Sequence, residues 1–265
     1  MELKTFKEEL EKRDGVSFGD NYVLFSDYEL YNLTNDESKI FRTFEDLLDY
    51  TIDKKTIREL IDERETMEEQ EYGGRGSSSG GSRGNLFSGR GSGRNGRRGE
   101  PGKGLLPPAY INTLTSSNKR TVESMTKAFG KNLINADREY AALLDKNGYA
   151  LEYTKGQKTS VTHLERKGAW SIHNHPTKKL GKGWSNAFSG QDLKNWALGN
   201  GKGTIVVASG NRTAYMVTKN QRFNSKKFIK AMNSASTSKG YDKGVDQFLK
   251  KNQREMGYKY SKFKF

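Results

Sequence analysis

The chain of 265 residues contains no cysteine and only three histidines. The absence of cysteine excludes disulfide bonds, thiolate nucleophiles and cysteine-ligated zinc, so any metal site must use histidine and carboxylate ligands. A reducing cytoplasm is compatible with this composition, although the composition does not fix the compartment. Only 32% of the residues are hydrophobic, which is low for a fully globular chain. Part of the length is therefore expected to lie outside a packed core.

Long apolar runs are also absent. No stretch approaches 18 consecutive apolar residues, so no transmembrane helix and no membrane partner are expected. The N-terminal sequence MELKTFKEELEKRDG is charged from its first residues and lacks the apolar core of a signal peptide. We therefore expect no secretion through a signal peptide.

The net charge of +14 is distributed unevenly along the chain. Residues 1–72 carry 10 Lys and Arg against 21 Asp and Glu, a net charge of −11. The remaining residues carry 36 Lys and Arg against 11 Asp and Glu, a net charge of +25. A block this basic favours polyanionic partners such as nucleic acid, and a merely basic, solvated surface is the alternative interpretation.

Composition and pattern divide the chain into four segments. Residues 1–72 predict a small acidic module, in which Thr43 caps the first of two helices. This module shows no catalytic pattern and is interpreted as a docking adaptor or a small structural domain. Residues 73–106, rich in Gly, Ser and Arg, cannot bury a core and predict a disordered linker. Residues 107–224 predict an α/β (α+β) domain, and residues 225–265 predict a basic helical tail.

Local signals place the helices and strands of the second half. The Asn147-Gly148 pair marks a tight hairpin, and Gly130 is expected to end the first helix. The expected helices are Asn118–Phe129, Ser189–Leu198, Ser225–Met232 and Tyr241–Lys251. The expected strands are Glu139–Leu144, Tyr149–Tyr153, Val161–His163, Ala169–His175, Thr204–Ser209 and Thr213–Thr218.

The segment WSIHNHP carries the first part of a candidate site. His173 and His175 stand two residues apart on an expected strand, so both imidazoles project from the same face. Pro176 then ends the strand, because it has no N–H to donate to a neighbouring strand. Two of the three histidines are thereby brought together.

The second part of the candidate site lies at an expected helix start. Ser189 is a good N-cap and Asp192 falls in the first turn, and capping alone explains both residues. The same helix start also holds the Asp192 carboxylate rigidly enough to ligate a metal, with the Ser189 hydroxyl beside it. Two histidines and one carboxylate, with a fourth position open to water, form a common catalytic zinc site.

The pattern His-x-His-Pro followed by Ser-x-x-Asp resembles the motif of the JAMM (JAB/MPN) zinc metallopeptidases, in the form found in phage and mobile-element proteins. The resemblance covers roughly residues 115–220 and implies a mixed β-sheet flanked by helices. It also implies one Zn²⁺ per chain held by His173, His175 and Asp192, and a role for Ser189 in stabilising the oxyanion of the reaction.

The resemblance further implies a glutamate from an earlier strand as the general base. Glu139 is the best match, and Glu152 and Glu165 stay open as alternatives, although Glu165 lies in a turn-like context. His163 is interpreted as a strand or surface residue rather than a fourth ligand. Thirteen residues separate the second histidine from the serine, more than is usual in the family, and Lys178–Asn186 are expected to form a loop over the site.

The activity implied by the resemblance is hydrolysis of an amide bond. In the family this is commonly an isopeptide bond at the C-terminus of a ubiquitin-like modifier, so a protein or peptide substrate is expected. The expected location is the cytoplasm of a host cell or a phage particle. The sequence does not indicate an oligomeric state.

A nucleic-acid-associated structural protein of a phage or mobile element, or an effector, is the alternative function. The linker contains Arg-Gly repeats, and the tail KKNQREMGYKYSKFKF interleaves aromatic residues with lysines, which suits phosphate contacts and base stacking. The alternative for the tail is a solvated basic helix whose aromatics pack on the domain. The residues predicted to contact nucleic acid are Arg97, Arg98, Lys226, Lys227, Lys250 and Lys251.

Overall fold

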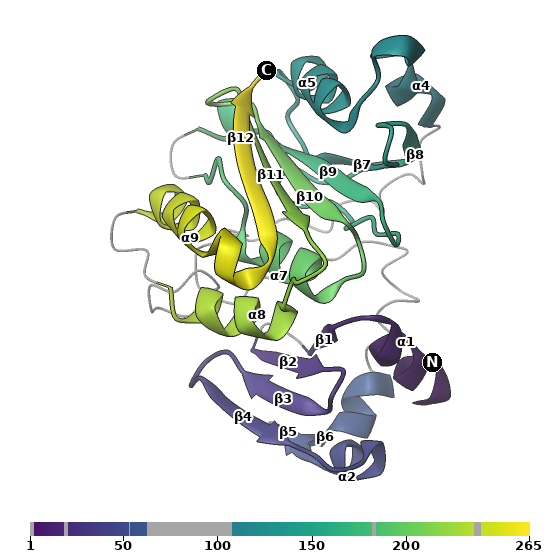
Figure 1. Cartoon of the computed structure of the whole chain (residues 1–265), viewed down its shortest axis with the longest axis vertical. Helices are drawn as coiled ribbons and strands as arrows, with labels where there is room; N and C mark the ends of the chain where they lie inside the picture. Colours follow the sequence, from purple (N-terminus) through teal and green to yellow (C-terminus); the bar gives the residue numbers. More distant parts are fainter. Residues whose placement is uncertain (1–2, 19–20, 53, 63–107, 182–183, 236–239) are drawn as a thin grey trace.

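The computed structural model describes residues 3–18, 21–52, 54–62, 108–181, 184–235 and 240–265, which Figure 1 shows as coloured ribbons. These residues form an N-terminal module, residues 3–62, and a C-terminal domain, residues 108–265. Both parts combine helices with antiparallel or mixed sheets, which confirms the predicted α+β class. The predicted linker, residues 73–106, lies outside the described residues.

The N-terminal module contains a four-stranded antiparallel sheet of order β1-β2-β3-β4 and a two-stranded sheet of β5 and β6. The predicted cap is present: Thr43 Oγ1 accepts the N–H of Asp46, whose carboxylate accepts the N–H of Thr43. Residues 57–62 are helical, as expected for the second helix. The other elements are α1 Leu3–Lys12, β1 Gly15–Phe18, β2 Tyr22–Phe25, β3 Glu29–Asn32, β4 Glu37–Ile40, α2 Phe44–Leu48, β5 Thr51–Ile52 and β6 Lys55–Thr56.

The C-terminal domain is built on a six-stranded sheet of order β12-β11-β10-β9-β7-β8. Neighbouring strands are antiparallel except β9 and β10, which are parallel. The strands are β7 Tyr140–Leu144, β8 Ala150–Lys155, β9 Trp170–His175, β10 Gly203–Ala208, β11 Thr213–Lys219 and β12 Tyr258–Lys264. The helices are α4 Pro108–Asn112, the 3-10 turn Ser117–Lys119, α5 Val122–Asn132, α6 Thr177–Leu180, α7 Gly190–Leu198, α8 Ser225–Asn233 and α9 Tyr241–Met256.

Helices cover both faces of this sheet (Figure 1). Along β10, Ile205 and Val207 pack with α4 and α5 on one face, whereas Val206 and Ala208 pack with α7, α8 and α9 on the other. Successive side chains of a strand point to opposite faces, so a strand covered on both sides is apolar at every position. The sequence GTIVVA of β10 follows this pattern from Ile205 to Ala208, and all six residues are buried.

The parallel pairing of β9 with β10 determines where the candidate site lies. Two parallel strands cannot be joined by a tight turn, so the chain must leave the end of β9 and cross one face of the sheet before β10 begins. The crossing segment contains α7, which packs against β10. Helix α7 therefore begins near the carboxyl end of β9, where His173 and His175 lie. Ligand sites in α/β sheets commonly lie at this end of the strands.

The C-terminal segment differs from the predicted tail. Helices α8 and α9 lie where helices were expected, but residues 258–264 form β12, which pairs with β11 at the edge of the sheet. Tyr258 and Tyr260 turn inward and are 3% and 8% exposed, so neither is placed for base stacking. The alternation of Tyr and Lys is therefore the period-two pattern of a strand with one buried face.

Two local predictions were wrong. Helix α5 continues through Gly130 instead of ending there, and a Cβ at Gly130 would lie 2.7 Å from the ring of Phe265, so this glycine permits close packing. Residues 161–163 lie in the loop between β8 and β9 rather than in a strand. Because β8 and β9 both pair with β7, this connection has to pass from one side of β7 to the other.

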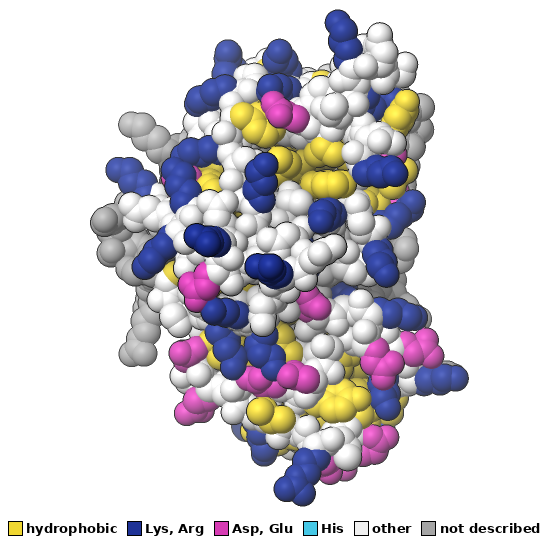
Figure 2. Space-filling view, viewed as in Figure 1, with side chains coloured by type: hydrophobic (Ala, Val, Ile, Leu, Met, Phe, Trp, Pro, Cys, Tyr) yellow, Lys and Arg dark blue, Asp and Glu magenta, His cyan; other side chains and the backbone are white. Residues whose placement is uncertain are grey.

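The N-terminal module packs against α7 and α8 of the C-terminal domain. Helix α8 lies between the two sheets in Figure 1, and the N–H of Asp14 donates to the carbonyl of Leu198 at the end of α7 at 3.0 Å. In Figure 2 most acidic side chains lie over the module, whereas Lys and Arg side chains spread over the domain. The acidic module and the basic domain are therefore in contact, and ion pairs link Asp27 and Glu29 of the module to Lys226 and Lys230 of α8. Apolar side chains of the module that join the core of the domain are Val23, Phe25, Tyr31 and Leu33.

Glu29 on β3 is a buried charge of this contact. It is 4% exposed, and its carboxylate oxygens accept from the ammonium groups of Lys226 and Lys230 on α8, each at 2.6 Å. Burial acts to raise the pKa of Glu29, but the hydrogen bonds from the two lysines lower it from 4.5 to about 2. Glu29 is therefore ionised in the folded protein at neutral pH.

We expect Glu29→Gln to lower the free energy of unfolding by about 3 kcal/mol at pH 7, because it leaves two ammonium groups without their buried partner. The folded pKa lies below the unfolded one, so this stabilisation is present above about pH 4.5 and is lost as the pH falls towards 2. Urea unfolding at pH 7 and pH 3 measures both effects. Asp27→Asn, which alters a 60%-exposed partner of Lys226, is the control and should cost less than about 1 kcal/mol. An equal loss of unfolding free energy in the two variants would contradict the role of Glu29 as a buried, stabilising charge.

Candidate metal centre

The two histidines of the candidate site project from the same face of β9. His173 is buried and His175 is half-buried, and their Nε2 atoms lie 3.1 Å apart. Ile172 points to the opposite face, where it packs in the core beneath α4 and α5. The strand therefore brings both imidazoles to the face that α7 covers.

Helix α7 supplies the third group. The Oγ of Ser189 accepts the N–H of Asp192 at 3.0 Å, and Oδ2 of Asp192 accepts the N–H of Ser189 at 2.7 Å. This reciprocal capping box fixes the carboxylate at the start of the helix. Oδ1 of Asp192 lies 3.3 Å from Nε2 of His173, and Oδ2 lies 3.6 Å from Nε2 of His175. The Asp192 carboxylate thus caps the helix and also lies against both histidines.

His173, His175 and Asp192, which we call the His/Asp cluster, could hold a metal ion. The converging atoms carry lone pairs, so they repel one another unless a proton or a cation lies among them. Ligand atoms bound at about 2.0–2.1 Å to a tetrahedral zinc ion are about 3.3 Å apart. The Nε2 atoms of the two histidines lie 3.1 Å apart, and they lie 3.3 and 3.6 Å from different oxygens of Asp192, so the distances are of this size. The donor types and their spacing therefore fit a metal ion.

The cluster shifts the pKa values of its own members. Burial acts to lower the pKa of His175, but the hydrogen bond to Asp192 and the negative charges of Asp192 and Glu139 raise it to about 9. Burial acts to raise the pKa of Asp192, but the two histidines hold it well below its usual range. A metal ion entering the cluster at neutral pH therefore has to displace a proton from His175.

Glu139 lies beside the cluster, directly before the first residue of β7. The β7–β9 register ends at the pair of Ala141 and His173, and Glu139 lies two residues before Ala141, on the same side of the chain. Its side chain is buried, and burial raises its pKa to about 7 against the opposing influence of the two histidines. A carboxyl group with a pKa near neutrality is suited to accept a proton and return it.

Asn174, between the two histidines, holds the backbone on both sides of Glu139. Its Oδ1 accepts the N–H of Tyr140 at 2.6 Å, and its Nδ2 donates to the carbonyl of Arg138 at 3.0 Å. Asn174 is 1% exposed, so these bonds also satisfy its buried amide. The sequence analysis did not select Asn174, although a polar residue pointing away from the histidines on a buried strand was an available signal.

The two alternative glutamates form ion pairs elsewhere. Glu152 on β8 pairs with Arg166 at 2.7 Å. Glu165 pairs with Arg13 of the N-terminal module at 3.1 Å and accepts the N–H of Asn200. Both carboxylates are therefore used for contacts outside the His/Asp cluster, whereas Glu139 lies beside it.

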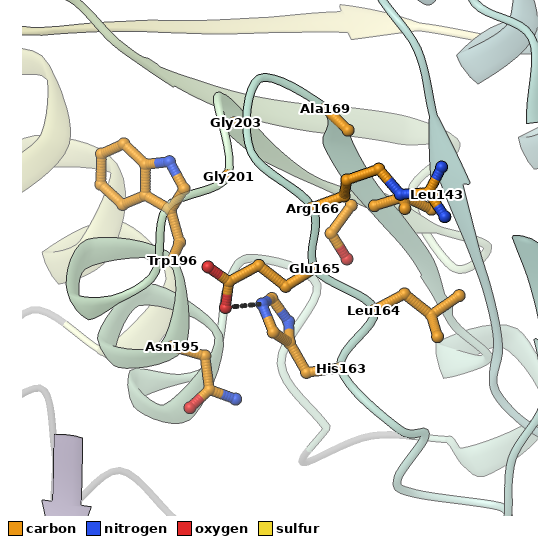
Figure 3. Close-up of a pocket in the computed structure, with 11 residues that line it drawn as sticks. Leu143, His163, Leu164, Glu165, Arg166, Ala169, Asn195, Trp196, Gly201 and Gly203 are labelled. Atoms are coloured by element: carbon orange, nitrogen blue, oxygen red, sulfur yellow. Dashed lines mark ion pairs between the residues drawn. The ribbon is translucent and has the colours of Figure 1, made fainter. Parts of the chain in front are cut away.

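The third histidine, His163, lies in the loop between β8 and β9. Figure 3 shows it facing Glu165, with 4.0 Å between Nε2 and the carboxylate, in a pocket that also includes Asn195 and Trp196 of α7. The pocket has a cavity volume of about 10 Å³, which is room for about one water. Burial lowers the pKa of His163. It is not a member of the His/Asp cluster.

The long connection between β9 and α7 returns to the cluster at Ser185. The carbonyl of Ser185 receives a hydrogen bond from Nδ1 of His175 at 3.2 Å. A carbonyl can only accept, so Nδ1 carries the hydrogen and Nε2 turns towards the other two members of the cluster. The sequence analysis placed a loop here but missed this contact, because a backbone carbonyl leaves no residue-type signal.

The basic residues predicted to contact nucleic acid have varied positions. Lys251 is exposed on α9, whereas Arg97 and Arg98 lie outside the described residues. Each of the other three forms an ion pair within the chain, which already matches its charge. The pairs are Lys226 with Glu29, Lys227 with Glu255, and Lys250 with Asp246.

Comparison with known proteins identifies no relative of this chain. No protein-family model, no curated protein and no solved structure matches it. The resemblance to JAMM metallopeptidases accordingly rests on the motif residues and their arrangement. In the part of the chain that the structure describes, no helix is both long and apolar enough to cross a membrane.

Proposed function

We propose that this chain is a zinc-dependent hydrolase of amide bonds, with a site of the JAMM type. The observation that supports this most strongly is the convergence of the His/Asp cluster, with the buried Glu139, directly before β7, beside it. A structural zinc site normally has four protein ligands, whereas three ligands leave a position for water or substrate. The buried carboxyl of Glu139 beside such a position favours catalysis over a structural metal.

The residues divide the chemistry among them. A zinc ion held by the cluster would lower the pKa of a bound water to about 7 and polarise the scissile carbonyl. Glu139 accepts the proton of the attacking water and passes it to the leaving amine. Ser189 donates its hydroxyl hydrogen to the developing oxyanion, since the helix cap uses only its oxygen as an acceptor. His173, His175 and Asp192 would hold the zinc ion.

The substrate follows from the resemblance rather than from the site. Amide hydrolysis implies a protein or peptide substrate, and an isopeptide bond to a ubiquitin-like modifier is the finer proposal. A role in nucleic-acid binding stays a prediction from the basic composition. The ion pairs of Lys226, Lys227 and Lys250 within the chain do not favour it. The host cytoplasm or a phage particle likewise stays the predicted location.

The test uses the full chain, purified without chelator. We expect about one zinc per chain by elemental analysis and cleavage of fluorogenic peptide or isopeptide substrates. Removing the metal should abolish cleavage, and adding zinc back should restore it, whereas Mg²⁺, which prefers oxygen ligands, should not. A protein that binds no zinc at micromolar concentration would exclude the proposal. A zinc-loaded protein that cleaves neither class of amide would exclude the hydrolase and leave a metal-binding protein.

A further inference from the structure

The first turn of α9 holds the loop that reaches the metal centre. The carboxylate of Asp242 accepts four hydrogen bonds from outside its own helix: one from the Ser185 hydroxyl at 2.7 Å, one from the N–H of Asn186 at 3.1 Å, one from the Asn186 side-chain amide and one from the N–H of Ala187, both at 3.4 Å. An acidic residue at a helix start is often explained by the helix dipole alone. Here, however, both carboxylate oxygens accept hydrogen bonds from residues 185–187, which we call the 185–187 loop.

The next contact connects this loop to the cluster. Ser185, whose hydroxyl bonds Asp242, also provides the carbonyl that accepts from Nδ1 of His175. A bond at Nδ1 fixes which nitrogen carries the hydrogen and how the ring is turned. Metal-binding histidines almost always have such a partner on the nitrogen that does not ligate, and its loss typically weakens metal binding.

Helix α9 also holds the residue that follows the 185–187 loop. The hydroxyl of Tyr241 donates to the carbonyl of Phe188 at 3.2 Å, directly before the cap residue Ser189. Two successive residues of α9 therefore hold residues 185–188, the last part of the connection before α7. Because α9 packs under β12 and beside α8, the loop is held by the core of the domain.

From these contacts we infer that Asp242 is a positioning residue for the metal centre. It holds the 185–187 loop so that the carbonyl of Ser185 sets the orientation and the tautomer of His175, with Nε2 directed at the metal position. This inference rests on the proposed function, since it presupposes that the His/Asp cluster binds zinc. It gives the C-terminal segment, which lies outside the JAMM resemblance, a direct part in the site.

The test measures zinc affinity of the full chain by competition with a chromophoric chelator. We expect Asp242→Asn, which keeps the shape but replaces one acceptor oxygen with a donor, to weaken zinc binding about 10- to 100-fold. Asp246→Asn is the matched control, because Asp246 lies one turn later on α9 and bonds Lys250, Lys262 and Tyr260. The zinc affinity of the control should stay within about twofold of that of the original chain, because Asp246→Asn removes no partner of a metal ligand.

A second readout separates positioning from a general loss of structure. The visible spectrum of the Co²⁺-loaded protein reports the ligand geometry, so it should change in Asp242→Asn and stay unchanged in Asp246→Asn. Ser185→Ala removes the hydroxyl contact but keeps the carbonyl, and it replaces Asp242→Asn as the deciding variant if that protein does not fold. We expect it to weaken zinc binding less than Asp242→Asn does.

The outcomes are distinguishable. Unchanged zinc affinity and an unchanged Co²⁺ spectrum in Asp242→Asn, with zinc bound by the original chain, would overturn the positioning role alone. Equal weakening in Asp242→Asn and Asp246→Asn would show a general effect of α9 and would also overturn it. Failure of the original chain to bind zinc would overturn the proposed function and this inference with it.

Discussion

Glu139→Gln is expected to lose amide hydrolysis while keeping its zinc. Glutamine has the shape of the glutamate but cannot accept the proton of the attacking water, and loss of a general base typically costs about 10²- to 10⁴-fold in rate. The three members of the His/Asp cluster are unchanged in this variant. Initial rates and elemental zinc should be measured on the same preparation. A rate within about threefold of the original would exclude Glu139 as the base, given the size of that expected loss.

Glu152→Gln is the control for this result. Glu152 was an alternative for the general base, and its carboxylate forms an ion pair with Arg166, whose side chain is about half exposed. We expect the Glu152→Gln protein to retain its hydrolytic rate, since an exposed pair of this kind contributes little. A large loss of rate in this variant, with Glu139→Gln unaffected, would transfer the assignment to Glu152.

His175→Ala is expected to lose zinc. Removing one of three protein ligands should weaken binding by more than about 100-fold, the upper range seen when only a partner of a ligand is lost. Hydrolysis should disappear with the metal, because the remaining groups no longer hold the ion in place. Zinc per chain after gel filtration, together with the affinity from chelator competition, measures the effect. Full zinc content and full rate in this variant would exclude the site.

His163→Ala provides the matched control among the three histidines. His163 lies near Glu165 in the loop before β9 and is outside the His/Asp cluster. Its removal should leave zinc binding unchanged within about twofold, because no ligand and no partner of a ligand is altered. The pair of variants therefore distinguishes loss of a ligand from loss of any histidine.

The N-terminal module has a defined relation to the site although it contributes none of its proposed residues. Arg13 of the module pairs with Glu165, and Asp14 bonds the carboxyl end of α7. Helix α7 carries Asp192 at its opposite end. The module thus pairs charges with the domain, through Arg13 and through Glu29 with Lys226 and Lys230, and supports the far end of the helix that presents the aspartate. Its role as a docking adaptor or a small structural domain stays a prediction.

The parts of the fold that follow from local chemistry were predictable. Thr43 and Ser189 cap helices because a hydroxyl satisfies the free N–H groups of a first turn, and this preference operates within four residues. The common face of His173 and His175 follows from the period of two along a strand. The hairpin at Asn147-Gly148 follows from the backbone freedom of glycine, whose φ there is +82°.

The parts that depend on pairing between distant segments were not predictable in this way. The sequence YKYSKFK was interpreted as the end of a helical tail, and only its partner β11 makes it a strand. Gly130 was interpreted as a helix stop. The structure shows instead that a glycine stands inside the helix because the ring of Phe265 leaves no room for a Cβ. Propensity is a weak determinant wherever tertiary contacts compete with it.

For the site itself, the sequence by itself determined the candidate ligands and their local presentation: two histidines on one face of a strand, and an aspartate fixed at a helix start. The tertiary structure decided that these groups meet, because the parallel pairing of β9 and β10 makes the chain cross back over the sheet and begin α7 above the histidines. It also decided that Glu139 lies beside the cluster, and that Ser185 and Asp242 hold His175 in place. These contacts join residues up to 57 positions apart, between Ser185 and Asp242, and no pattern within a short stretch of sequence encodes them.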